Sequence, residues 1–394
     1  MGGVVLGLVL GGGLVAAASV PLPTGPPGLS LTIPAAPASA ALPSLPFPSQ
    51  GESAVTIPTL GVFMVHGPQT PVPIASLTKL MTAYVALKVL PLGLNDTGPS
   101  LTVTAADVAE YNHDIKTGQS CVVVAAGEVL TERQLLDGML VHSASNFASM
   151  LSRMVAGDTS TMVSEMNANA SQLGLTATSY ADVSGLNPSS ESSATDVLHL
   201  ASLLMRNPTF AAIVRQTSVE LPVAGTVSTY TPYLGKPGVV GVKTGTTSES
   251  GGCMVMAFDA IVGGRVVQVL DAVLGQRSVH YSLLEAAGHA ALVLASGTVH
   301  HITAWRVALA GAPVGALGWP TRSVPVMATN TVIVPTFPGV PAQDQVLDQH
   351  WGRSAVPAGT AVATLFVRTG SYSIVSELLT AAALTRPTLL DRLR

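Results

Sequence analysis

The sequence predicts an α+β domain over residues 54–298, followed by a small all-β domain over residues 299–375 and a tail over residues 376–394. In the first part, helical periodicity fills most of the stretch between an early strand and several late strands. The late strands, between residues 242 and 274, are joined by short turns, as in an antiparallel sheet. Beyond residue 299, strand-like runs alternate with Gly/Pro turns. Helices grouped between an early strand and an antiparallel sheet indicate the α+β class.

Low charge is the main feature of the composition. Charged residues make up 10% of the 394 residues, and the formal net charge is -4, whereas about 25% charged residues is typical of soluble domains. The sequence has no Lys/Arg cluster, so binding to nucleic acid is not expected. The histidines are scattered apart from His300-His301, and neither cysteine has a cysteine nearby in sequence. We therefore expect no metal site and no cofactor.

The N-terminal segment indicates export. Residues 4–20 carry no charge, and Ala16-Ala17-Ala18 is a small-residue cleavage site, so residues 1–20 are interpreted as a signal peptide or an apolar anchor. A disordered apolar tail is the alternative, because the basic residues that begin a signal peptide are missing. Residues 21–53 are rich in Pro, Ala and Ser and read as a linker. The expected location is extracytoplasmic, either secreted or attached to the outer face of the cytoplasmic membrane.

The first elements of the α+β domain surround a serine. Residues 54–65 are rich in β-branched side chains and predict an opening strand. Pro71 and Pro73 then break the chain, and apolar residues repeat at helical spacing over residues 76–90. Ser76 is therefore expected at a helix N-terminus, with Lys79 one turn later on the same face.

The remaining elements follow in order. Further helices are expected over residues 132–141, 146–155, 160–173, 194–206 and 281–295, and strands over residues 242–246, 253–262 and 266–274. Gly263-Gly264 predicts a hairpin turn between the last two strands. In the all-β domain the strand-like runs cover residues 302–310, 324–334 and 360–367. Residues 374–394 are interpreted as a terminal helix interrupted by Pro387, or as an amphipathic segment in contact with a membrane surface.

Two of the five lysines lie in short motifs that complete each other, Ser76-Leu77-Thr78-Lys79 and Lys243-Thr244-Gly245. A serine hydroxyl is a weak nucleophile and needs a base within hydrogen-bond reach. Lys79 can act as that base if burial beside a second cation, Lys243, keeps its amine partly neutral. Taken alone, Ser76 could be an ordinary helix N-cap, and the second motif an ordinary solvated turn.

A third motif, Ser143-Ala144-Ser145-Asn146, lies 67 residues after Ser76 and 100 residues before Lys243. Hydroxyl and amide groups in a loop between helices can relay a proton and hold an amide substrate. Three motifs in this order are far more specific than any one of them. The pattern is typical of serine enzymes that are acylated by penicillin.

At these residues the sequence resembles the D-alanyl-D-alanine carboxypeptidases, the low-molecular-mass penicillin-binding proteins. The resemblance covers residues 54–295 and implies a β-lactamase/transpeptidase-like fold. It also includes segments outside the three motifs, namely Gly127-Glu128-Val129-Leu130-Thr131, Met166-Asn167, Leu173-Gly174, Ser184-Gly185-Leu186 and residues 237–247.

The resemblance implies catalytic roles for Ser76, Lys79 and Ser143. Ser76 would be the acylated nucleophile, Lys79 its general base, and Ser143 the group that passes a proton to the leaving group. The N–H groups of Ser76 and Thr246 would form the oxyanion hole. Lys243 and Thr244 would bind the terminal carboxylate. The residues expected at the substrate are Ser145, Asn146, Lys243, Thr244, Gly245, Thr246 and Arg277.

The expected substrate is a peptidoglycan stem peptide ending in D-Ala-D-Ala, with β-lactam antibiotics as covalent inhibitors. One departure bears on activity, since Ser145 stands where the family has Asn. Either Ser145 replaces the amide or the loop presents Asn146. Two alternatives stay open: a class A-like β-lactamase, for which Glu191 is the nearest candidate glutamate, and a catalytically impaired wall-binding homologue.

The two cysteines flank site segments, since Cys121 precedes the Ser143 loop and Cys253 follows Lys243. Export to an oxidising compartment permits a disulfide between them. We predict either that bond or two buried thiols near each other.

Overall fold

The computed structural model describes residues 25–38, 40–349 and 355–388. The chain forms two compact units. The α+β unit comprises Pro43–Ile261 and Arg265–His301, and the β unit comprises Val262–Gly264 with the described parts of Met1–Leu42 and Ile302–Arg394. The signal peptide or anchor expected at residues 1–20 lies outside the described residues.

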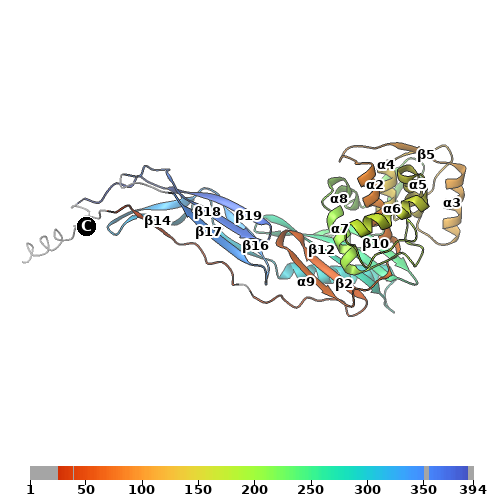
Figure 1. Ribbon diagram of the computed structural model, residues 1–394, viewed down its shortest axis with the longest axis horizontal. Helices are drawn as coiled ribbons and strands as arrows, with labels where there is room; N and C mark the ends of the chain where they lie inside the picture. The colour runs from red at the N-terminus through yellow and green to blue at the C-terminus, as the bar shows by residue number, and fades with distance from the viewer. Residues whose placement is uncertain (1–24, 39, 350–354, 389–394) are drawn as a thin grey trace, which may run out of the picture. The chain divides into compact units, whose positions relative to one another are not determined.

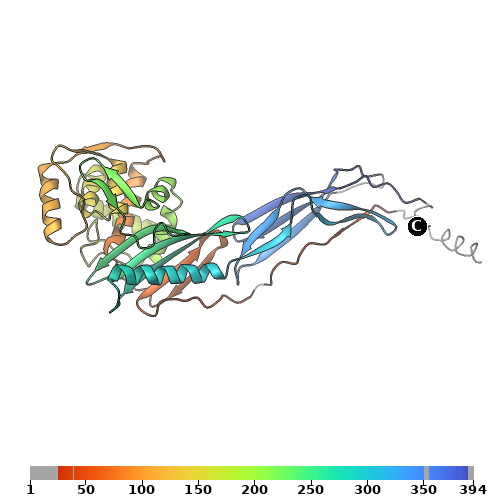
Figure 2. The same ribbon diagram turned by 180° about the vertical axis from the view of Figure 1, so that it is seen from behind.

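The α+β unit is built on a five-stranded sheet with the strand order β10-β11-β12-β2-β3. Its strands are β2 (Glu52–Ile57), β3 (Val62–His66), β10 (Val239–Thr247), β11 (Gly251–Val262) and β12 (Arg265–Gln276). Helix α7 (Ala194–Leu204) covers one face and α9 (Leu283–His300) the other, as the opposite views of Figures 1 and 2 show. Every residue of β2 is buried, because both faces of the sheet are covered.

Turn residues decide where these strands end. The predicted hairpin at Gly263-Gly264 is confirmed, and both glycines have positive φ, 59° and 79°. The single strand expected over residues 54–65 is wrong, because the chain turns back within it. A 3₁₀ turn at Pro58–Leu60 ends at Gly61 (φ 68°), and β3 then pairs antiparallel with β2.

The helices of this unit pack around one apolar core. They are α2 (Lys79–Val89), α3 (Ala105–Lys116), α4 (Glu132–Val141), α5 (Ser145–Ala156), α6 (Thr159–Gln172), α7, α8 (Pro208–Val214) and α9. Three two-stranded ladders join the loops: β4 (Val72–Pro73) with β7 (Glu191–Ser192), β5 (Ser100–Thr102) with β6 (Val129–Thr131), and β8 (Ser218–Leu221) with β9 (Gly225–Ser228). The predicted helices 132–141, 146–155, 160–173, 194–206 and 281–295 are confirmed with small shifts, whereas α3 and α8 were not predicted.

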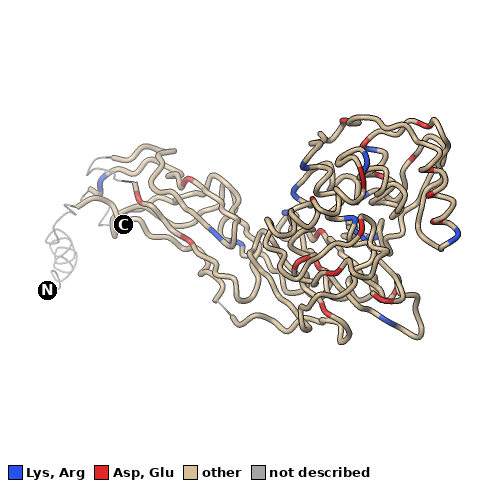
Figure 3. Tube along the Cα trace, turned by 45° about the vertical axis from the view of Figure 1, so that its right-hand side comes forward, with Lys and Arg blue, Asp and Glu red and all other residues tan. Residues whose placement is uncertain are grey.

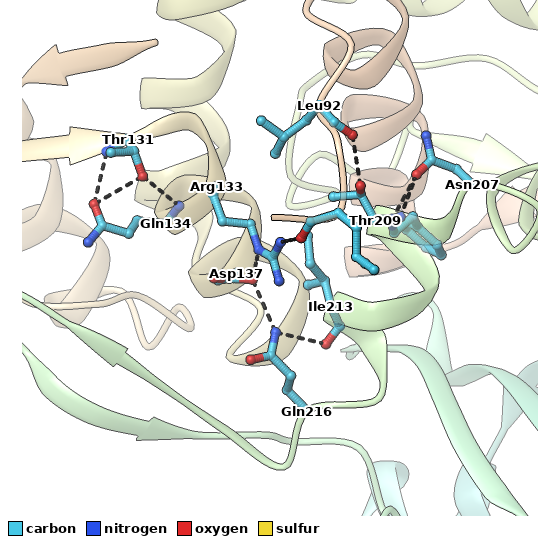
Figure 4. Close-up of polar contacts among 11 residues, drawn as sticks. Leu92, Thr131, Arg133, Gln134, Asp137, Asn207, Thr209, Ile213 and Gln216 are labelled. Atoms are coloured by element: carbon cyan, nitrogen blue, oxygen red, sulfur yellow. Dashed lines mark hydrogen bonds and ion pairs between the residues drawn. The ribbon is translucent and has the colours of Figure 1, made fainter. Parts of the chain in front are cut away.

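Polar side chains define the ends of α4 and α8 (Figure 4). Thr131 and Gln134 form a reciprocal capping box at the start of α4, and the Asn207 side chain accepts from two N–H groups at the start of α8. Arg133 and Gln216 both donate to the Asp137 carboxylate, at 3.0 Å and 3.2 Å. The contact from Gln216 ties the second residue after α8 to the middle of α4.

The β unit contains a six-stranded sheet in the order β1-β14-β15-β19-β18-β17 and a two-stranded ladder of β13 with β16. Its strands are β1 (Gly28–Leu31), β13 (Thr303–Ala308), β14 (Pro313–Trp319), β15 (Arg322–Ala328), β16 (Val332–Thr336), β17 (Ala342–Asp348), β18 (Ala361–Thr369) and β19 (Tyr372–Thr380). Both sheets contribute to one core, which includes Trp305, Leu317, Val334 and Leu365. The strand-like run 324–334 divides between β15 and β16.

Two expectations about this unit are wrong. The linker assigned to residues 21–53 supplies β1, which pairs with β14 through Gly28↔Gly318 to Leu31↔Gly315. Trp319 also donates from Nε1 to the Gly25 carbonyl. The terminal helix or amphipathic segment assigned to residues 374–394 instead begins within β19, which pairs with both β18 and β15. The last six residues lie outside the described part.

The described charges are sparse, and Figure 3 shows them scattered without a basic stripe. Among the described helices, no single one is long and apolar enough to cross a membrane. The pair α7 and α8, bent by 111°, meets that test by length and composition.

Candidate active site

Ser76 lies in a 3₁₀ turn, Ala75–Thr78, that immediately precedes α2. The helix itself begins at Lys79, so the predicted helical start at Ser76 is a tighter turn than expected. Ala75 has a positive φ of 47°, an uncommon conformation for a residue with a side chain. Local strain of this kind often marks functional sites. The turn brings the Lys79 Nζ to 2.9 Å from the Ser76 Oγ.

Lys79 is completely buried. Burial disfavours its charged form and lowers its pKa to about 7, although the carboxylates of Asp182 and Asp114 act in the opposite direction. Near neutral pH a substantial fraction of Lys79 is therefore neutral. A neutral amine in hydrogen-bond contact with a serine hydroxyl has the geometry of a general base.

A loop formed by residues 182–186, here called the Asp182 loop, completes the surroundings of Lys79. The Ser184 carbonyl accepts a hydrogen bond of 2.8 Å from Lys79 Nζ. Asp182 holds the loop by accepting from the N–H groups of Gly185 and Leu186, both at 2.8 Å. Sequence reasoning did not assign Asp182 or Ser184 to the site. The sequence Asp182-Val183-Ser184-Gly185 could have indicated this loop, because an aspartate in a turn often accepts hydrogen bonds from the N–H groups that follow it.

Gly185 allows this loop to approach the nucleophile. Its φ is 85°, and a Cβ at this position would lie 1.8 Å from the Ala75 carbonyl oxygen. Any side chain would therefore separate the loop from the nucleophile turn and withdraw the Ser184 carbonyl from Lys79.

The second lysine joins the third motif to the sheet. Lys243, on β10, is buried, and its Nζ donates to the Ser143 Oγ at 2.8 Å and to the Thr244 carbonyl at 2.9 Å. Burial, and then the charge of Lys79, lower the pKa of Lys243 well below its usual value. Ser143 lies in the loop between α4 and α5 and has a positive φ of 61°. The structure thus brings Ser76, Lys79, Ser143 and Lys243 into one connected site.

Strand β10 lies directly against the nucleophile turn. A Cβ added to Gly245 would lie 2.9 Å from both the Ser76 N and the Ile74 carbonyl oxygen. Glycine is therefore required for the backbone of β10 to approach the Ser76 N–H. Thr244 is buried beside it, whereas Thr246 is exposed at the end of the strand. This arrangement fits an oxyanion hole built from the N–H groups of Ser76 and Thr246.

The structure distinguishes Ser145 from Asn146. Ser145 is buried, and its Oγ accepts from Lys79 Nζ at 3.4 Å. The Asn146 amide faces another segment, because its Oδ1 accepts from the Val122 N–H at 3.1 Å and its Nδ2 donates to the Val122 carbonyl at 2.8 Å. Ser145 therefore takes the motif position, and the idea that the loop presents Asn146 to the substrate is wrong.

Arg277 is exposed and follows β12 directly. Its Nη2 donates to the carbonyls of Ser248 and Glu249, at 2.8 Å and 3.1 Å, in the turn after β10. The guanidinium thus braces that turn. Its contribution to carboxylate binding stays a prediction.

The predicted disulfide is wrong, and of the two thiols expected to be buried only Cys253 is. Cys121 and Cys253 are both free, Cys121 is half-buried, and Cys253 is buried. Burial raises the pKa of each thiol to about 11, so neither is a reactive thiolate at neutral pH.

Other candidate groups lie elsewhere or are missing from the described part. Glu191, the glutamate considered for a β-lactamase, lies in β7, where its backbone pairs with Ser179 and Pro73. The described residues contain no group of three or more His, Cys, Asp or Glu side chains placed to hold a metal ion.

Solved structures of penicillin-binding proteins share this fold. Penicillin-binding protein 6B from Escherichia coli superposes with a TM-score of 0.59 and 22% identity, covering 89% of this chain and 99% of that one. The Streptococcus pneumoniae regulatory factor PBP3 gives a TM-score of 0.60 and 19% identity, covering 84% and 98%. These similarities confirm the fold class expected from the sequence.

Curated relatives agree at the level of sequence. The chain is 36% identical over 188 residues to the D-alanyl-D-alanine carboxypeptidase DacB2 of Mycobacterium tuberculosis, covering 45% of this chain and 59% of that protein. It is 28% identical over 190 residues to DacF of Bacillus subtilis, covering 46% of each chain. The match thus spans about half the length of these relatives.

The sequence profile of the D-alanyl-D-alanine carboxypeptidase family matches residues 52–276. This match covers more than half of the chain and includes all three motifs of the site. The chain therefore belongs to the D-alanyl-D-alanine carboxypeptidase family of peptidases.

Proposed function

We propose that this chain is an exported serine-type D-Ala-D-Ala carboxypeptidase that removes the terminal D-alanine of peptidoglycan stem peptides through an acyl-enzyme on Ser76. The observation that carries the proposal is the buried Lys79 amine, with a pKa of about 7, placed 2.9 Å from the Ser76 hydroxyl. A second buried lysine, Lys243, which donates to the Ser143 hydroxyl beside the same site, supports it.

Acylation begins with proton transfer. The neutral Lys79 amine takes the proton of Ser76, and the Ser76 Oγ attacks the carbonyl carbon of the penultimate D-alanine. The N–H groups of Ser76 and Thr246 stabilise the oxyanion that forms. The C–N bond then breaks as the Ser143 hydroxyl, held by Lys243, passes a proton to the nitrogen of the departing D-alanine. Ser143 regains a proton from protonated Lys79, so Lys79 is neutral again before deacylation. The products are free D-alanine and an ester on Ser76.

Deacylation uses the same groups. Water attacks the ester carbonyl, Lys79 takes a proton from that water, and the Ser76 oxygen leaves and regains its proton. The shortened peptide is released as a free acid. A β-lactam would acylate Ser76 by the same first step, with its amide nitrogen held in a ring, which supports covalent inhibition by penicillins.

The preference for chain ends follows from charge. Lys243 and Thr244 are the groups proposed to bind the carboxylate of the terminal D-alanine. Two of the relatives are D-alanyl-D-alanine endopeptidases, from Pseudomonas aeruginosa and Haemophilus influenzae. A site that requires a free carboxylate favours removal of the last residue over cleavage inside a cross-link.

Export is proposed because the substrate lies outside the cytoplasmic membrane. The uncharged run at residues 4–20 supports it. Detection of the native protein in extracytoplasmic fractions, with or without residues 1–20, tests this part separately from the reaction.

The reaction is tested with a pentapeptide stem ending in D-Ala-D-Ala and the same peptide with an amidated C-terminus. D-Alanine should be released from the free acid and not from the amide. Ser76→Ala should abolish both turnover and penicillin labelling. Lys79→Ala should slow acylation by ~100-fold or more, the loss typical of removing a general base. The matched control is Lys88→Ala, which removes an exposed lysine from the same helix. Undiminished D-alanine release by Ser76→Ala would refute the mechanism.

A further inference from the structure

A cavity adjoins the surroundings of Lys79. Its volume is about 460 Å³, within the range of roughly 300–1,000 Å³ usual for ligand sites. Two of its lining residues, Ser145 and Ser184, also contact Lys79, through Oγ at 3.4 Å and through the carbonyl at 2.8 Å. The cavity is therefore continuous with the surroundings of the general base.

Three carboxylates line this cavity, Glu110 and Asp114 from α3 and Asp182 from the Asp182 loop. Asp182 is occupied in holding its own loop. Asp114 differs, because it is only 5% exposed. Its carboxylate makes no side-chain hydrogen bond or ion pair with a described residue, and the charged groups that act on it are His113 and Lys79. A buried carboxylate without a partner is costly, and a cationic ligand would remove that cost.

The rest of the lining suits an aliphatic chain that ends in an amine. Val163, Val183 and Leu186 supply apolar contacts, while the carboxylates lie among hydroxyl groups of Ser149 and Ser160. A flexible methylene chain packs on apolar groups and leaves its charged end to polar partners. The described residues offer no metal-binding group of three or more His, Cys, Asp or Glu, which favours an organic cation over a metal ion.

The way the peptide substrate would lie in the site also favours an aliphatic amine in this cavity. In the proposed function, the terminal carboxylate lies at Lys243 and Thr244 on β10. The acyl part of the peptide extends from the scissile carbonyl away from that carboxylate. Ser145, which borders the cavity, contacts Lys79 beside Ser76 and so offers this part of the peptide a path into the cavity. The side chain of the residue preceding the two D-alanines is the part of the stem that can enter it.

We propose that this cavity binds the side-chain ammonium group of a diamino acid at the third position of the stem peptide, with Asp114 as its principal carboxylate and Glu110 as a second. The inference rests on the proposed function and assigns a specificity to the same site. It predicts selection for stems whose third residue has a free side-chain amine, and against stems in which that amine is acylated or cross-linked.

Such a ligand would also act on the base. The carboxylates of Asp182 and Asp114 both raise the pKa of Lys79. An ammonium bound at Asp114 would offset the field of these carboxylates and favour neutral Lys79. The acid limb of the rate profile should therefore lie at lower pH for the free-amine peptide than for its acetylated form.

The test compares two pentapeptides of the form acetyl-L-Ala-D-Glu-L-Lys-D-Ala-D-Ala, one with a free lysine ε-amine and one with that amine acetylated. For the unaltered protein, kcat/KM for D-alanine release should be roughly 10- to 100-fold higher with the free amine, as expected for one buried charge-assisted contact. Asp114→Asn should reduce this ratio to near one. Glu165→Gln, which removes an exposed carboxylate of α6 outside the cavity, should preserve it. Equal kcat/KM values for the two peptides with the unaltered protein would overturn the proposal.

A second measurement is independent of turnover. Calorimetry on the Ser76→Ala protein gives Kd for both peptides, and the free-amine peptide should bind roughly tenfold tighter or better. Equal binding, or no binding of either peptide, would overturn the proposal. Preferential binding without D-alanine release from the unaltered protein would refute the proposed reaction while supporting the ammonium site.

Discussion

Lys79 combines two opposing influences at one atom. Burial favours its neutral form, and the carboxylates of Asp182 and Asp114 favour the charged form, which leaves the pKa at about 7. Because the neutral amine is the reactive form, penicillin acylation should fall about tenfold per pH unit below pH 7 and level off above it. The acylation rate constant measured from pH 5 to pH 9 checks this profile.

The same reasoning predicts the direction in which the acid limb of this pH profile moves in a variant. Asp114→Asn removes a carboxylate that stabilises charged Lys79, so the pKa of Lys79 should fall and the acid limb should move to lower pH. Glu165→Gln, an equal loss of charge at an exposed position, should leave the limb in place. A limb that moves to higher pH in Asp114→Asn would contradict the assignment of Lys79 as the base.

Neighbouring residues of the third motif differ in what they stabilise. Asn146 makes two hydrogen bonds to the backbone of Val122, whereas Ser145 makes one long contact to Lys79. Asn146→Ala should lower the free energy of unfolding by ~1–3 kcal/mol, since two buried backbone groups lose their partner. Ser145→Ala should change it by less than ~1 kcal/mol. Urea denaturation of both variants provides the comparison, and a reversed order would refute this division of roles.

At the scale of elements, the site depends on a close approach between loops. Gly185 and Gly174 both have positive φ, 85° and 70°, but a Cβ would collide with Ala75 only at Gly185, while Gly174 faces open space. Gly174→Ala should cost ~1–2 kcal/mol of stability through backbone strain alone and leave acylation unchanged. Gly185→Ala should cause the same backbone strain and also displace the Asp182 loop, which should slow acylation by about 100-fold or more.

Penicillin acylation rates and melting temperatures of both variants separate the two effects. Equal loss of activity in both, or retention of activity in Gly185→Ala, would show that the close approach is not needed.

Elements with a strong local signal could be predicted from the sequence. Helix α4 was predicted at its observed bounds from its amphipathic repeat, and the capping box that the structure shows at its start agrees with that boundary. Strand β19 was mistaken for a helix, since its buried positions include Ser376 and Thr380, which hide the alternation of apolar residues. The missed helix α3 has the same kind of cap at Thr104 and Asp107 but few buried apolar residues. Missing α3 also meant missing the cavity, since Glu110 and Asp114 come from it.

Contacts between distant segments could not be predicted from motifs. The three motifs identified Ser76, Lys79, Ser143 and Lys243 because their spacing is informative. The carbonyl of Ser184 carries no signal of its own, since any residue has one. The linker expected over residues 21–53 looked unable to pack, yet Leu29 and Leu31 add to the β unit's core by pairing with β14.

At the scale of the whole molecule, all of the site residues belong to the α+β unit. A fragment of residues 43–301 should therefore fold cooperatively and be labelled by penicillin at a rate within about twofold of the full chain. A folded fragment labelled more than tenfold slower would show that the β unit shapes the site.

The domain boundaries predicted from the sequence, residues 54–298, define a second fragment whose stability can be compared with that of the 43–301 fragment. That shorter fragment lacks Glu52, a buried residue whose carboxylate accepts from the N–H of Ala194 at 2.7 Å and of Thr70 at 3.0 Å. Its loss leaves the first N–H of α7 and a loop N–H without their partner and shortens β2 by two residues. Each unsatisfied buried group costs ~1–3 kcal/mol, so the 54–298 fragment should melt well below the 43–301 fragment. Adding residues 52 and 53 back to the 54–298 fragment should recover most of the difference in melting temperature. The 43–301 fragment with Glu52→Gln should melt below the unaltered 43–301 fragment, because a neutral amide accepts hydrogen bonds more weakly than a carboxylate. Equal melting temperatures for the 43–301 and 54–298 fragments would show that Glu52 does not hold α7 to the sheet.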